Sequence, residues 1–151
     1  MLKLSLIGLL LIVVTVVIHA IGTTSWVRHL GAKYVQQDGR FAVRKWLQIL
    51  SFTGLILVAL HIVQISLWAF TYRLLVPVEE LPNFETAIYF SFVTFTTLGY
   101  GDITLSEGWR LLSGIEAMNG ILLVGWSTAV LFAVVQRIWQ SSAPAAKSEK
   151  Q

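Results

Sequence analysis

One run of residues, from Thr96 to Asp102, has a composition suited to binding a bare cation. Gly99 and Gly101 can adopt positive φ at little steric cost, and this freedom lets successive peptide carbonyls point to the same side of the strand. The carbonyls of Thr97, Leu98, Gly99 and Tyr100, with the Thr97 hydroxyl, could then replace the water around a dehydrated ion. Glycine and aspartate are also turn residues, so the run taken alone is equally compatible with a simple turn.

The neighbouring segments favour the first interpretation. A short apolar helix is predicted for Phe84–Thr97, with Asn83 as its N-cap and Glu85 in its first turn. About 14 residues at roughly 1.5 Å each are too short to cross a bilayer, so this helix must enter the membrane and turn back inside protein. The partial negative charge at its C-terminal end would favour a cation there.

Composition indicates a membrane protein. Hydrophobic residues make up 56% of the chain and charged residues only 13%, and the mean hydropathy is +0.72, which is too apolar for a soluble domain of this length. The chain contains no cysteine, so disulfides are excluded. Spans are predicted at Leu2–Ile21, Leu47–Phe70 and Leu111–Val135. A cleaved signal peptide is the rival interpretation of the first span.

Charge is distributed unevenly between the connecting segments. Residues 22–46 carry five bases against the single acid Asp38, which predicts a basic cytoplasmic loop. This loop would attract anionic lipid headgroups weakly, and nothing in it requires a nucleic acid. Between Tyr72 and Arg110 there are five acids and two bases, so this acidic face is expected on the opposite side. Residues 140–151 are small, polar and charged, and are predicted to form a disordered cytoplasmic tail.

The motif in this context resembles the selectivity filter of tetrameric pore-loop potassium channels, and the chain is most similar to small prokaryotic members with a two-transmembrane pore module. The resemblance covers Leu47–Arg137, and Leu98 stands where valine is commoner. It implies an all-α membrane protein of three transmembrane helices, a re-entrant pore helix (84–97) and a filter loop (97–101), assembled as a homotetramer. The first span (1–21) lies outside the module. K⁺, held at Thr97, Leu98, Gly99 and Tyr100, would be the permeant ion, with no cofactor and no enzymatic activity.

The same resemblance implies roles for residues around the filter. Asp102 would lie at the outer mouth, and Tyr89 stands where the family often has a tryptophan that packs around the filter. Gly120 stands near the gating hinge, although close helix packing is an equal alternative. The residues implied to support the filter are Tyr89, Ser91, Thr94 and Glu116; those implied to line the pore are Ile121, Val124, Thr128 and Phe132.

Polar residues within the spans leave alternatives open. Glu116 could form hydrogen bonds behind the filter near Ser91 or Thr94, or be protonated and structural. His61 could sense protons, but an interhelical hydrogen bond is the favoured interpretation. Trp68 and Tyr72 are expected at the outer interface.

The topology follows from motif and charge together. A filter that faces outward places Met1 outside the cell membrane and the C-terminus in the cytoplasm, and a removed signal peptide would reverse this arrangement. A weakly selective cation channel, a non-conducting auxiliary subunit that keeps the pore fold, and a membrane enzyme using Glu116, His61 and Asp102 remain as alternatives to a K⁺-selective channel.

Overall fold

The computed structural model describes residues 2–34 and 43–142, and every regular element in this part of the chain is a helix: α1 (Leu2–Tyr34), α2 (Val43–Leu75), α3 (Phe84–Phe95) and α4 (Glu107–Ser142). Three of them, α1, α2 and α4, are long and apolar enough to cross a membrane, whereas α3 is a shorter apolar helix. The prediction of an all-α protein with three spanning helices and one short helix is confirmed.

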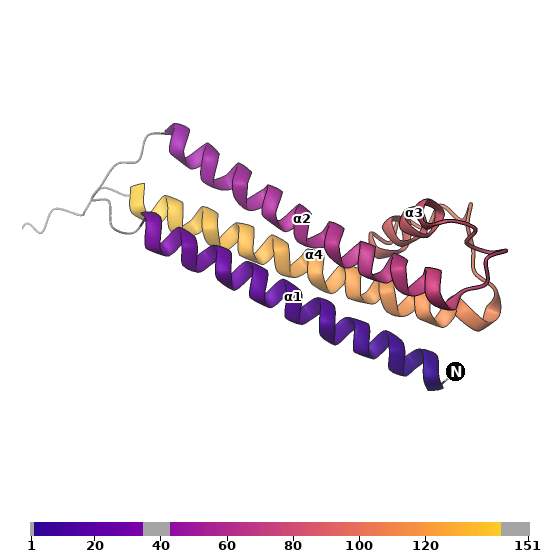
Figure 1. Ribbon diagram of the computed structural model, residues 1–151. Coiled ribbons are helices and arrows are strands. Elements are labelled where there is room, and N and C mark those ends of the chain that lie inside the picture. The colour runs from indigo at the N-terminus through magenta and orange to yellow at the C-terminus, as the bar shows by residue number, and fades with distance from the viewer. Residues whose placement is uncertain (1, 35–42, 143–151) are drawn as a thin grey trace, which may run out of the picture.

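The helices lie side by side, as Figure 1 shows, with α1 and α4 running in one direction and α2 in the other. The N-terminal end of α1 lies at the same end of the molecule as α3, and the start of α2 and the end of α4 lie at the opposite end. The first residues of α1 therefore share an end with the 96–102 segment, as the predicted topology requires.

Each long helix extends past the bounds predicted from the sequence. The first helix continues from Ile21 to Tyr34, α2 runs from Val43 to Leu75, and α4 begins at Glu107 and ends at Ser142. The prediction counted only the residues needed to fill the hydrocarbon layer, whereas a helix keeps its hydrogen bonds into the polar headgroup region. Much of the expected basic loop is thus helical, and residues 35–42 and 143–151 lie outside the described residues.

The short helix α3 has the predicted start but a different end. Asn83 is the N-cap, its side chain accepts a hydrogen bond from the Thr86 amide at 2.8 Å, and Glu85 lies in the first turn. The helix ends at Phe95 rather than Thr97, because Thr96 forms the C-cap and Thr97 has a φ of +59°, which a right-handed helix excludes. Because the helix ends here, residues 97–101 are not held in helical hydrogen bonding and can adopt another backbone conformation.

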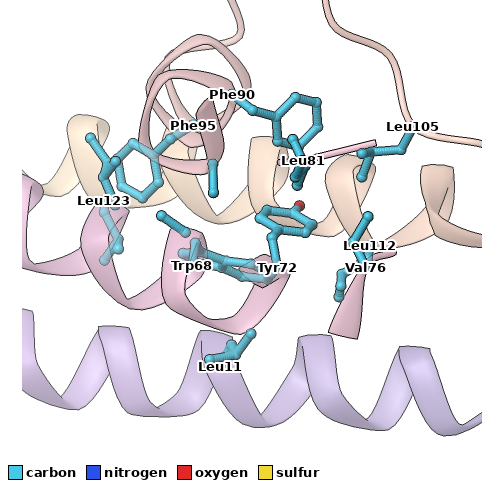
Figure 2. Packing of buried hydrophobic residues seen from close by; sticks show 13 residues of the cluster. Leu11, Trp68, Tyr72, Val76, Leu81, Phe90, Phe95, Leu105, Leu112 and Leu123 are labelled. Carbon is cyan, nitrogen blue, oxygen red and sulfur yellow. The ribbon is translucent and has the colours of Figure 1, made fainter. Parts of the chain in front are cut away.

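Aromatic residues of α2 form the centre of the core, as Figure 2 shows. Trp68 and Tyr72 are completely buried, so their predicted place at the outer interface is wrong. Their rings pack against each other and Tyr72 meets Phe90 of α3 edge to face, with ring centroids 5.1 Å apart. Because α3 and its connections cover this end of α2, the aromatic side chains pack against protein instead of headgroups.

The first helix is packed closely against α2 and α4. Its Gly8 lies against Ile115 and Leu112 of α4, and its Gly22 lies so close to Leu60 of α2 that an added Cβ would come within 2.6 Å of a Leu60 methyl. Small residues allow such close approach in membranes, where helix association depends on packing. The first helix is therefore part of the packed bundle.

Candidate functional site

The backbone of Thr97–Gly101, here called the candidate filter segment, alternates between positive and negative φ. Thr97, Gly99 and Gly101 have φ values of +59°, +55° and +79°, and Leu98 and Tyr100 between them have negative φ. In such an alternating conformation successive peptide groups turn to the same side, unlike those of an ordinary strand. The positive φ expected of the two glycines is observed.

Thr97 adopts the same left-handed conformation, which the sequence did not predict. A β-branched residue with positive φ is a backbone outlier, and conformations of this kind cost about 1–3 kcal/mol and cluster at functional sites. The surrounding structure must hold Thr97 in place, and the end of α3 does so through the hydrogen bonds of the following residues.

The first three amide groups of the segment are bonded to α3. The Thr97 amide donates to the Thr94 carbonyl at 2.9 Å, and the Leu98 and Gly99 amides donate to the Val93 carbonyl at 2.9 and 3.3 Å. No carbonyl from Thr97 to Tyr100 accepts a hydrogen bond from any described residue. The segment thus uses its first three donors inside the chain, whereas the carbonyls of Thr97–Tyr100 have no partner among the described residues.

A side-chain hydrogen bond joins the end of the segment to α3. The Tyr89 hydroxyl donates to Asp102 Oδ2 at 2.6 Å, and this bond raises the pKa of the Tyr89 hydroxyl above its ordinary value, because the ionised phenol would lose its donor and face a carboxylate. The two residues that sequence analysis placed around the filter are therefore direct partners.

The chain beyond the segment is tied back to the α2–α3 connection. Glu80 accepts two hydrogen bonds from Ser106, at 2.8 Å from the backbone amide and 2.9 Å from the hydroxyl. Ser106 directly precedes α4, and its carbonyl accepts from the Trp109 and Arg110 amides. Sequence analysis counted Glu80 only among the acidic residues, because its partner lies 26 positions away.

Glu116 lies behind α3 and is completely buried. The hydroxyls of Ser91 and Tyr72 lie beside its carboxylate, but no described residue forms a hydrogen bond with either oxygen. Of the two predicted neighbours, Ser91 is brought to Glu116 and is itself buried, whereas Thr94 is half-buried and bonds through its carbonyl to Thr97. Tyr72 was missed as a neighbour because it was expected at the interface.

Gly120 of α4 lies in very close contact with the end of α3. A Cβ added there would overlap the Phe95 carbonyl oxygen and come within 2.7 Å of the Phe95 carbonyl carbon. This contact explains the glycine by close packing, the alternative that sequence analysis left open, and the hinge role stays a prediction. The four predicted pore-lining residues are exposed in the single chain: Ile121, Val124, Thr128 and Phe132.

His61 makes the interhelical hydrogen bond that was favoured for it. Its Nε2 lies 2.9 Å from the Ser127 hydroxyl of α4, and its ring meets Phe95, the last residue of α3, at a centroid distance of 5.7 Å. The identity of this partner, Ser127, and the contact with the ring of His19 were not predicted. The available signal was that both are polar residues within predicted spans, and other polar residues of the same spans, such as Thr15 and Glu116, give the same signal.

Comparison with known proteins shows which family contains this arrangement of helices. The family model described as an ion channel matches residues 58–137, which comprise the greater part of α2, all of α3, the candidate filter segment and most of α4. The match covers more than half of the chain. The chain therefore belongs to this family of ion channels, which are not enzymes, and is a multi-pass membrane protein.

A similar curated protein is the calcium-gated potassium channel TvoK of Thermoplasma volcanium. The two chains are 38% identical over 61 residues, which are 40% of this chain and 18% of that protein. This chain therefore matches less than a fifth of the relative's length. No solved structure matches the chain.

Proposed function

We propose that the protein is a potassium-selective channel in which four copies of the candidate filter segment surround one ion path. The observation that carries this proposal is the alternating backbone of Thr97–Gly101, with its first three amides bonded to α3 and the carbonyls of Thr97–Tyr100 accepting no hydrogen bond from the described residues. Four such strands around an axis would offer rings of carbonyl oxygens in place of the hydration shell of K⁺. The similar TvoK protein, itself described as a potassium channel, supports K⁺ as the ion.

The end of α3 supports the same ion. Its last carbonyls point toward the base of the segment, and a helix C-terminus carries about half a negative charge. Four such ends would stabilise a cation in the cavity below the filter, which we expect Ile121, Val124, Thr128 and Phe132 to line. At the outer mouth, Asp102 adds to the acidic face.

A homotetramer follows from the incompleteness of one chain. All residues of the candidate filter segment are exposed in the single chain, and the side chains of Leu98 and Tyr100 are 54% and 67% exposed. Neighbouring copies would cover these apolar side chains and complete the oxygen rings. Native mass spectrometry of the protein in mild detergent should show four chains; a monomer or dimer as the sole species would contradict the assembly.

The proposed orientation is that of a cell-membrane channel with its filter outside. Met1 is then extracytoplasmic, and Lys33 and Gln151 are cytoplasmic. Because the chain has no cysteine, single cysteines introduced at these three positions can be labelled with an impermeant reagent. If Lys33→Cys were labelled from outside intact cells, the chain would have the opposite orientation to the one proposed.

Flux measurements on liposomes reconstituted with the full chain test the function. The proposal predicts rapid K⁺ efflux and far slower Na⁺ efflux, with empty liposomes as the control. Equal fluxes of the two ions would make the protein a weakly selective cation channel. No flux from liposomes that contain intact tetramers would make it a non-conducting subunit with the pore fold.

A further inference from the structure

Four side chains from three helices form a closed ring of hydrogen bonds in the middle of the bundle. His19 comes from α1, His61 and Gln64 come from α2, and Ser127 comes from α4. Gln64 Nε2 lies 3.0 Å from His19 Nδ1, and Gln64 Oε1 lies 3.2 Å from His61 Nδ1. The Ser127 hydroxyl closes the ring, at 2.9 Å from His61 Nε2 and 3.3 Å from His19 Nε2.

A fifth contact fixes the direction of every hydrogen bond in the ring. Gln64 Nε2 also donates to the Thr15 carbonyl at 3.4 Å, so its amide nitrogen, not its oxygen, faces α1. The amide then donates to His19 Nδ1, and neutral His19 carries its hydrogen on Nε2 and donates to Ser127. The Ser127 hydroxyl in turn donates to His61 Nε2, and His61 Nδ1–H donates to the Gln64 oxygen. The two histidines therefore have opposite tautomers.

The ring has four contacts and four hydrogens, and a fifth hydrogen acts differently at the two histidines. A proton added to His61 goes to Nε2, where the Ser127 oxygen, which has two lone pairs, can accept from both histidines while its own hydrogen turns out of the ring. A proton added to His19 goes to Nδ1 and faces the Gln64 amide, which cannot turn without setting its oxygen against the Thr15 carbonyl. The His19 proton therefore replaces a hydrogen bond by a contact between two donors, and a lost partner is costly for groups as buried as His19 and Gln64.

No other ionisable group faces the ring from the described residues. On α1, Lys3 and Arg28 lie near the two ends of the helix; on α2, Tyr72 lies beside Glu116; α3 contributes the apolar ring of Phe95; and α4 contributes Trp126 against His19. Each imidazole is the nearest ionisable group to the other, with ring centroids 5.4 Å apart. A positive charge on one would therefore lack a carboxylate partner.

We propose that this ring is a proton-binding latch: it fastens α1 and α2 to α4 while both histidines are neutral, and it opens when His19 takes up a proton. Ser127 is adjacent to the predicted pore-lining Thr128, and His61 lies against the last residue of α3. Opening the ring therefore frees α4 next to the ion path and beside the base of the filter. The effect on conduction rests on the proposed channel function, whereas the ring itself does not.

Nitrogen NMR of the full chain in bilayers, labelled at histidine nitrogens only, tests the ring independently of ion flux. At neutral pH the imidazole shifts should show one locked Nε2–H tautomer for His19 and one locked Nδ1–H tautomer for His61. The exposed His29, the chain's third histidine, is the internal control and should show rapid exchange between tautomers. Gln64→Leu, which removes both Nδ1 contacts, should release both locked tautomers. The same tautomer in His19 and His61, or exchange averaging in both, would overturn the ring.

Potassium flux from liposomes tests the control of conduction between about pH 8 and about pH 4, a range that covers the titration of free and buried histidines. The flux of the wild-type protein should change across this range. Ser127→Ala and His61→Gln should lose that change, and His29→Gln should keep it. None of these variants changes an outer carboxylate, so the difference between variants is the result that counts. An unchanged pH response in both ring variants would overturn the latch as a control of conduction, whatever the NMR result.

Discussion

The candidate filter segment and the buried ring treat their polar groups in opposite ways. The carbonyls of Thr97–Tyr100 accept no hydrogen bond from the described residues and are exposed in the single chain. The ring of His19, His61, Gln64 and Ser127 pairs its polar atoms within one chain. The difference teaches that the polar groups of the ring find their partners within one chain, whereas the carbonyls of the segment do not. What the segment lacks is supplied by a cation and by other copies, according to the proposed function.

The largest effect is expected from Gly99→Ala. Gly99 has a φ of +55° and the nearest atom to an added Cβ is 4.0 Å away, so the backbone conformation is the obstacle and space is not. An L-residue in this conformation costs about 1–2 kcal/mol in each chain, and relief of the strain would turn a carbonyl out of its ring. We expect K⁺ flux to be lost while the tetramer persists by native mass spectrometry.

Gly108→Ala is the matched control for this change. Gly108 lies in the first turn of α4, has no positive φ and has no atom within 4 Å of an added Cβ, so its flux should equal that of the wild type. If Gly99→Ala carries normal, selective K⁺ flux, residues 97–101 are not the filter.

The next largest effect is expected from Gly120→Ala, which acts on packing. The added Cβ would overlap the backbone of Phe95, and overpacking of this kind costs at least about 1–3 kcal/mol. Thermal unfolding of the tetramer should occur at a lower temperature, and the flux should fall because α3 carries the filter. Gly114→Ala, with open space around its Cβ, should leave unfolding unchanged. Equal unfolding temperatures for the two variants would contradict the close contact.

A smaller effect is expected from Thr97→Ala. The substitution removes one hydroxyl per chain and keeps the carbonyl, so the innermost ion position loses side-chain oxygens and the main-chain rings remain. Selectivity for K⁺ over Na⁺ should fall, and block by Ba²⁺, an ion close in size to K⁺, should weaken. Unchanged Ba²⁺ block would show that this hydroxyl does not contact the ion.

The smallest effect is expected from Tyr89→Phe, which removes the hydrogen bond to Asp102 at an exposed position. The segment should lose its outer tie, and flux should decline during prolonged recording while initial selectivity stays close to that of the wild type. Because the bond raises the pKa of the Tyr89 hydroxyl, its contribution is fully present below the ordinary pKa of 10 and is lost as the pH rises through the higher folded value. A spectroscopic phenol titration, with wild type and Tyr89→Phe compared, checks this direction.

Local patterns predicted much of this molecule. Apolar runs gave the spanning helices, Asn83 and Glu85 gave the start of α3, and the two glycines gave the positive φ values, because each of these features depends on a few adjacent residues. The long helices extend beyond the predicted spans, since chain continuation into the headgroup layer leaves no apolar signal.

Contacts between distant positions were not predictable in the same way. The burial of Trp68 and Tyr72 depends on α3 folding over α2, and the bond between Glu80 and Ser106 joins two loops. The ring needed the relative rotation of α1, α2 and α4, which composition does not specify. His61 was correctly given an interhelical partner, but the identity of that partner came only from the structure.

The most direct test of the central claim is to locate the ion. Crystals of the full tetramer grown in Rb⁺, a cation chemically similar to K⁺, should give anomalous peaks on the four-fold axis between the carbonyls of Thr97, Leu98, Gly99 and Tyr100, and these peaks should disappear when Na⁺ replaces Rb⁺. An axis without such peaks, or one lined by the amide groups that here face α3, would contradict a potassium filter made from this segment.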